Sequence, residues 1–182
     1  MPTILTHAAV PLALGLGLGP KLVSRPLLVA GVVASVLPDL DVLAFRLNIH
    51  YSDILGHRGF SHAILFALII AFAAIALSRQ LRTSRITAFI FVAISALSHG
   101  FLDMFTNGGL GVALWWPWTN ERFFAPWQVI EVSPLSLHRV FSERGIAVLQ
   151  SEFLWVWMPA IVVLISLLGI RRIYSKSPNE LI

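Results

Sequence analysis

The chain has 182 residues, of which 57% are hydrophobic and only 12% are charged. An ordinary soluble domain carries about 25% charged residues, so this composition excludes a soluble globular protein and indicates an integral membrane protein. The net charge of +4 does not indicate nucleic-acid binding, because the basic residues cluster at the ends of apolar segments, where lipid head groups and topology account for them. The absence of cysteine excludes disulfides, thiolate metal ligands and cysteine nucleophiles.

Five apolar segments are each close to the roughly 17 to 25 residues that a membrane-spanning helix needs. We therefore predict an all-α, polytopic membrane helix bundle that forms a single domain over the whole chain. The predicted spans cover residues 4–20, 26–45, 60–78, 86–105 and 150–170. The first segment has no basic region before it and no cleavage pattern after it, so we interpret it as a retained helix.

The predicted outer segment, residues 106–149, is too rich in tryptophan and too sparsely charged for a flexible linker. Its tryptophans are typical of an interfacial belt, with substrate stacking as the alternative: Trp115, Trp116, Trp118 and Trp127. Apolar residues near its end are expected to form a short helix on the membrane surface: Leu135, Leu137, Val140 and Phe141.

The distribution of basic residues predicts how the chain crosses the membrane. Eight of the 13 Lys and Arg residues fall on one side of the five spans. The positive-inside rule assigns that side to the cytoplasm. We therefore expect a multi-pass protein of the cell inner membrane, with the amino terminus outside and the carboxyl terminus in the cytoplasm.

Ionisable residues lie near the outer ends of four of these spans. His99 and Asp103 are four residues apart in the fourth span, and a helix places such a pair on one face. An ionisable pair at membrane depth usually faces the bundle interior and serves a function. A rise of about 1.5 Å per residue brings further ionisable residues to the same level: His7, Asp39, Asp41 and His62.

Each of these residues also has a simpler explanation. His7 could be an interfacial histidine bonded to nearby backbone, and aspartates after Pro38 could cap a helical turn. Arg58 could be a snorkelling cation or a clamp for an anionic group. We favour metal ligation because donors from separate segments converge: His7, Asp39, Asp41, His57, His62, His99 and Asp103.

Four histidines and three aspartates exceed the ligands that one ion requires, so we expect one or two divalent ions with an open position for water. Imidazole and carboxylate donors suit Zn²⁺, with Mn²⁺ as the alternative. Such a site can lower the pKa of bound water and, with two ions, clamp a phosphoryl group. Two other histidines, His50 and His138, lie in hydrophilic outer segments, and we expect their side chains to be solvated.

The order of these motifs resembles a known family. An early histidine is followed by LPDLD at 37–41, GHRGFSH at 56–62, SHGFLDMFTNGG at 98–109 and a tryptophan–proline patch at 115–118. This succession is similar to the bacterial inner-membrane proteins classed as metal-dependent hydrolases, whose best-known members are linked to LexA regulation. The resemblance implies a helical membrane protein with a hydrolase site and gives all seven candidate ligands that role.

A more distant similarity points to zinc-dependent phospholipase C and the S1/P1 nucleases, which are helical enzymes with clustered zinc ions. Those soluble enzymes have a final His-x-x-x-Glu pair for which this chain has no clear equivalent. Glu131 is the candidate for the missing carboxylate or for the catalytic base.

The leading hypothesis is a membrane-bound metallohydrolase that acts on a phosphoester, either a lipid or a lipid-linked phosphate, at the outer leaflet. Asp41 or Glu131 would accept the proton of the attacking water, and Arg58 would steady the anionic group. The alternatives are an ion- or proton-coupled transporter and a metal-stabilised scaffold without catalysis. The expected partners are membrane lipids and the lipid substrate, with no nucleic acid, and the sequence leaves the oligomeric state open.

Overall fold

The computed structural model describes residues 2–133 and 142–175. Within these ranges the regular structure is helical, and the only β pairing is two isolated bridges, Thr106 to Ile130 and Val112 to Phe123. The surface helix expected from Leu135 to Phe141, and the solvated His138 within it, lie outside the described residues.

Helices and short helical turns alternate along the described chain. The α-helices are α1 (Ala9–Leu18), α2 (Arg25–Val36), α3 (Ile64–Ala76), α4 (Arg85–Met104), α5 (Glu143–Glu152) and α6 (Met158–Ser175). Three 3₁₀ segments are η1 (Thr6–Ala8), η2 (Leu37–Leu47) and η3 (Phe60–His62), and η5 (Phe153–Trp157) is a π-helix. Because η2 continues α2 and η5 joins α5 to α6, two helical rods are longer than any single element.

The two composite rods and α4 are long and apolar enough to cross a membrane: Arg25–Leu47, Arg85–Met104 and Glu143–Ser175. They correspond to the second, fourth and fifth predicted spans, although the last rod begins at residue 143 and not at 150. The helices at the first and third predicted spans are shorter, at Thr6–Leu18 and Ile64–Ala76. The described fold is therefore all-α, with three long apolar candidate spans and two shorter apolar helices.

Local sequence explains where several helices begin and end. Gly19 has a φ of 79° and ends α1, because glycine adopts positive φ without a steric cost. The Ser24 Oγ accepts a hydrogen bond from the backbone N–H of Leu27 at the start of α2. The Ser84 Oγ does the same for Thr87 at the start of α4, so both serines satisfy N–H groups that have no partner inside the helix.

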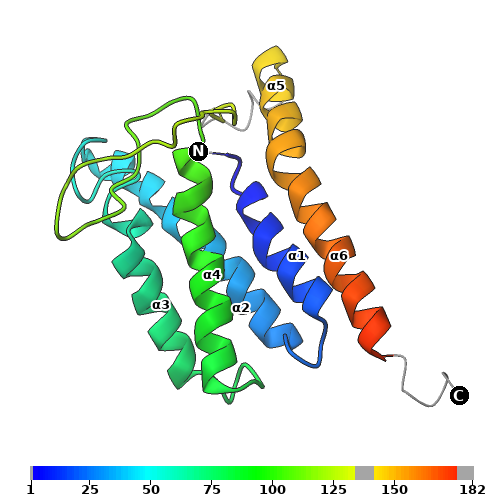
Figure 1. The fold of residues 1–182 in the computed structure, drawn as a ribbon. Coiled ribbons are helices and arrows are strands. Elements are labelled where there is room, and N and C mark those ends of the chain that lie inside the picture. The colour runs from blue at the N-terminus through cyan, green and yellow to red at the C-terminus, as the bar shows by residue number, and fades with distance from the viewer. Residues whose placement is uncertain (1, 134–141, 176–182) are drawn as a thin grey trace, which may run out of the picture.

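The central helix of the bundle is α4, which packs against α2 and α3, while α1 packs against α2 and α6. Figure 1 shows the helices side by side, with the long loops at one end and the last described turn of α6 at the other. We call the end with the long loops the loop end, and the end with the last described turn of α6 the basic end. Small side chains fill the core between α2, α3 and α4 and allow close approach of the helices: Ala34, Ala67, Ala71, Ala74, Ala88, Ala93 and Ala96.

Candidate metal centre

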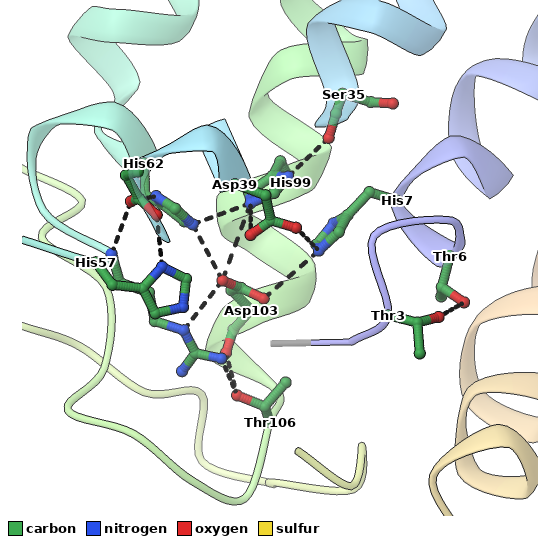
Figure 2. Close-up of polar contacts among 12 residues, drawn as sticks. Thr3, Thr6, His7, Ser35, Asp39, His57, His62, His99, Asp103 and Thr106 are labelled. Carbon is green, nitrogen blue, oxygen red and sulfur yellow. Dashed lines mark hydrogen bonds and ion pairs between the residues drawn. The ribbon is translucent and has the colours of Figure 1, made fainter. Parts of the chain in front are cut away.

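Two overlapping groups of histidine and aspartate side chains lie at the loop end, where η1, η2, η3 and the end of α4 meet (Figure 2). In each group, one donor atom from every residue lies within 4.8 Å of the others. The main group consists of Asp39, His62, His99 and Asp103. The second group consists of Asp41, His57 and His62.

The two aspartates of the LPDLD motif serve different groups because of the helix that carries them. Pro38 lacks the N–H that an α-helix would need there, and the chain continues from α2 as the 3₁₀ segment η2. With 3.0 residues per turn, positions two apart point about 120° away from each other. Asp39 therefore faces His99, while Asp41 faces His57.

The imidazole nitrogens of the main group point at one another and at the carboxylates. The Nε2 atoms of His62 and His99 lie 2.9 Å apart, and His62 Nε2 is 3.2 Å from Asp103 Oδ2. His99 Nε2 is 3.4 Å from Asp39 Oδ1. His99 Nδ1 donates to the Ser35 carbonyl at 2.7 Å, and since a carbonyl only accepts, that nitrogen carries the proton. The other ring nitrogen of His99, Nε2, faces the centre.

His7 comes from η1 and completes the main group from the opposite side. Its Nε2 lies 3.7 Å from both Asp39 Oδ2 and Asp103 Oδ1, and its ring stacks on His99 with centroids 3.7 Å apart. Neither ring nitrogen of His7 and no carboxylate oxygen of Asp39 or Asp103 makes a well-formed hydrogen bond within the described structure. Buried polar atoms are costly without compensation, and this set of nitrogen and oxygen donors fits a divalent cation such as Zn²⁺.

Asp41 binds the two histidines of the second group and not the centre of the main group. Its Oδ1 lies 2.5 Å from His57 Nδ1. Its Oδ2 accepts from the backbone N–H of Arg58 at 3.0 Å and from the Ser61 hydroxyl at 2.6 Å. His62 Nδ1 lies 3.1 Å from the same oxygen, which leaves His62 Nε2 free to act as a ligand. A carboxylate on the far nitrogen of a ligand histidine is the common way to fix its orientation.

Arg58 is fully buried and holds Asp103 in place. Its Nε lies 3.1 Å from Asp103 Oδ2, its Nη1 donates to the Gly108 carbonyl at 2.9 Å, and its Nη2 donates to the Thr106 hydroxyl at 2.8 Å. Its backbone φ of 61° lies in the left-handed region. Because every nitrogen of the guanidinium is engaged by the protein, the geometry favours orientation of Asp103 over the anion-clamp role that the sequence suggested.

The segment after α4 folds over the centre and closes it. Arg122 donates to the backbone carbonyls of Tyr51, Asp53 and His57 at 2.9 to 3.0 Å, which ties the outer segment to the loop before η3. Burial lowers the pKa of Arg122 and raises the pKa of Tyr51, whose ring meets the edge of the His57 ring at 5.3 Å. The side chains of both groups are at most 4% exposed, so neither group is open to solvent.

Other residues singled out in the sequence lie apart from the two groups. Glu131 is in neither group, and its backbone N–H donates to the Ser151 hydroxyl, so its role as base or ligand stays a prediction. His50 is exposed, as expected, and bonds to the Ser52 hydroxyl at 2.7 Å. Trp115, Trp118 and Trp127 are at least half exposed, and the interfacial belt also stays a prediction.

A buried carboxylate that sequence reasoning passed over anchors the His7 segment. Glu152 is 1% exposed, and its oxygens accept from the Thr3 N–H, from the Thr3 hydroxyl at 2.7 Å and from the Thr6 hydroxyl at 2.7 Å. Trp157, five residues further along, donates to the Thr6 hydroxyl at 3.1 Å, because the π-helix η5 turns residues five apart toward the same side. The sequence did contain a signal for Glu152, because an acidic residue at the start of an apolar segment usually has a specific partner.

The fold and the site together define a helical membrane protein with a buried histidine and aspartate centre at one end of its bundle. The chain belongs to the YdjM inner membrane protein family, which it matches over residues 1–176. It is 46% identical over 173 residues to the inner membrane protein YbcI of Escherichia coli (strain K12), covering 94% of this chain and 99% of that relative. No solved structure matches the chain. The resemblance found in the motifs is thus confirmed at the level of an inner-membrane family, and neither name states a reaction.

Proposed function

We propose that this inner membrane protein is a metal-dependent hydrolase that cleaves a phosphoester, either a lipid or a lipid-linked phosphate, at the outer leaflet. One observation carries the proposal: donors from four segments meet in a closed interior, where both His7 ring nitrogens and the carboxylate oxygens of Asp39 and Asp103 make no well-formed hydrogen bond within the described structure. These groups face one another and Arg58 in ion pairs of 3.1 to 4.0 Å, and a bound cation would supply the close partner that their buried oxygen and nitrogen atoms lack.

The main group and His7 are the residues that would hold the cation. Two carboxylates and two or three imidazoles are a donor set for Zn²⁺, with Mn²⁺ as the alternative. A divalent ion at such a site supplies Lewis acidity toward a phosphoryl oxygen and lowers the pKa of water. The proposal includes one or two ions: a second ion would be held by the second group, in which case His57 and Asp41 would act as its ligands and not in proton transfer.

His57 and Asp41 are the residues we assign to proton transfer. The Asp41 carboxylate holds His57 through Nδ1, and His57 Nε2 makes no hydrogen bond within the described structure. An imidazole oriented by a carboxylate and free at its other nitrogen is suited to accept a proton from water and return it to the leaving group. Asp41 itself is less suited to be the base expected from the sequence, because its oxygens already face several donors. Glu131 is the second candidate base.

The lipid substrate follows from the position of the centre in the bundle. The centre lies at the loop end of the bundle, and lipid head groups are expected at the ends of a bundle in an inner membrane protein. We propose five membrane spans, in which η1 and η3 lengthen the two shorter helices, with the amino terminus outside and the carboxyl terminus in the cytoplasm. This topology places the centre at the outer leaflet, within reach of a phosphorylated lipid.

The test combines metal analysis with an assay. The full chain, purified in detergent, is expected to hold one or two equivalents of metal and to hydrolyse a member of a panel of phosphodiesters and phospholipids. The His99→Ala and Asp103→Ala variants should lose both properties, whereas His50→Ala, which removes an exposed histidine, should keep both. A wild-type protein that binds no added Zn²⁺ or Mn²⁺ would remove the basis of the proposal.

Two other functions would be recognised by their own measurements. Metal-dependent melting with no hydrolysis of any panel member would identify a metal-stabilised scaffold. Proton or metal flux in proteoliposomes, abolished by Asp103→Asn, would identify a transporter. Between the centre and the basic end, the core of α2, α3 and α4 is apolar. A cation would find few polar side chains along that route, which favours the hydrolase over an ion path.

A further inference from the structure

A cavity of 780 Å³ lies at the basic end of the bundle, far along the helices from the metal centre. It is open on one side, and the end of α1, the turn after it and the last turns of α6 line it. Its walls combine leucines with cationic side chains: Leu18, Leu22, Leu168, Lys21, Arg171 and Arg172. The described lining contains no carboxylate, so the cavity carries net positive charge beside an apolar surface.

Arg171 is built into the rim of this cavity. Its Nη1 donates to the carbonyl oxygens of Leu16 and Gly17 at 3.3 Å, and these carbonyls at the end of α1 have no partner inside the helix. A side chain at Gly19 would collide with the Arg171 guanidinium, so the glycine leaves room for that group. Lys21 and Arg172 are exposed, and neither pairs with an acidic side chain within the described structure. Their charges are available to a ligand.

We propose that this cavity binds the head group of an anionic phospholipid, with the acyl chains lying against the leucines of α1 and α6. The charge calls for an anion, and the leucine walls give a lipid a contact that a soluble anion does not use. Basic pockets between helices of membrane proteins bind anionic head groups in this way, with each nearby Lys or Arg adding attraction. α6 exposes an apolar surface and buries none of its residues, so this surface is available to acyl chains.

The bound lipid would connect two helices of the bundle at the basic end. α6 packs mainly on α1, and the cavity lies between the ends of these two helices. A head group that contacts Lys21 on one side and Arg172 on the other would join the two helices. The protein should therefore melt at a higher temperature when the lipid is present, because ligand that binds only the folded state stabilises it.

The experiment measures binding of phosphatidylglycerol to the full chain in detergent by native mass spectrometry, with phosphatidylcholine as the neutral probe. The double variant Lys21→Gln/Arg172→Gln is expected to bind phosphatidylglycerol more weakly, by about fivefold for each charge removed. The matched control is Arg79→Gln/Arg85→Gln, which removes two exposed charges, one from the α3–α4 turn and one from the first residue of α4, at the same end of the bundle. That control should bind like the wild type.

Leu168→Trp tests the cavity without a change of charge, because the larger ring fills space beside the leucine walls. It should also weaken phosphatidylglycerol binding. Equal losses in the cavity variant and the control, wild-type binding by Leu168→Trp, or equal binding of phosphatidylcholine would overturn the proposal. A rise in melting temperature with inorganic phosphate as large as the rise with the lipid would overturn it as well. Metal content, measured in parallel, should be unchanged in all variants, which separates this proposal from the hydrolase.

Discussion

The Nε2 atoms of His62 and His99 lie 2.9 Å apart, although the other nitrogen of each ring is already engaged by Asp41 or by the Ser35 carbonyl. Two lone pairs at that distance repel each other unless a proton or a cation lies near both. The carboxylates of Asp39 and Asp103 approach the same point and add negative charge. A divalent cation would relieve the repulsion between the lone pairs and would also balance the charge of the carboxylates.

Removal of metal should destabilise the protein. Chelation leaves the facing histidines and carboxylates uncompensated, whereas bound metal at a thousandfold above Kd adds about 4 kcal/mol to the free energy of unfolding. We expect EDTA to lower the Tm of the wild type by several degrees and to change that of His99→Ala much less. His50→Ala, with its ligands intact, should respond as the wild type does. A wild-type Tm that is insensitive to chelator would contradict the prediction.

Asp41→Asn should weaken metal binding without abolishing it. The amide cannot accept equally well from His57, Ser61 and His62, so the His62 ring loses its fixed orientation but keeps its nitrogen. Loss of such an outer partner costs about 10- to 100-fold in affinity. Asp103→Asn, which changes a direct donor, should cost more. Titration with Zn²⁺ in a competing chelator measures both, and the reverse order of the two variants would show that Asp41 is itself a ligand.

Sequence reasoning grouped most of the residues that lie together, because helix periodicity relates His99 to Asp103 and because the expected spans end at one level. It treated Asp39 and Asp41 as one set, although residues two apart on a helix point to different sides; that Asp39 meets His99 and Asp41 meets His57 follows from long-range packing. It could not foresee that Glu152 bonds to Thr3 and Thr6, about 146 residues away, because no local pattern encodes a contact between the two ends of the chain.

Arg58→Lys should destabilise the fold although it keeps the charge. An ammonium group cannot reach Asp103, Thr106 and the Gly108 carbonyl together, because these partners surround a planar guanidinium. Breaking a buried ion pair costs about 3 to 5 kcal/mol, and we expect a loss toward the lower end of that range. Thermal unfolding in detergent measures it, with Arg46→Lys at an exposed site as the control. If Arg58→Lys melts like the wild type, the guanidinium contacts contribute little.

Glu152→Gln should loosen the segment that carries His7. The glutamate accepts three hydrogen bonds from Thr3 and Thr6, and the amide that replaces one of its oxygens would point N–H groups at donors. Hydrogen bonds to a charged group contribute about 1.5 to 3 kcal/mol each, so the substitution should lower both Tm and metal affinity, because His7 follows Thr6 directly. Glu143→Gln, an exposed change on the same helix, should alter neither.

The two effects separate the possible roles of Glu152: a lower Tm with unchanged metal affinity would mean that it stabilises α5 and α6 against η1 without positioning His7. Restored metal affinity in Glu152→Asp, which keeps the carboxylate, would assign the positioning to its charge.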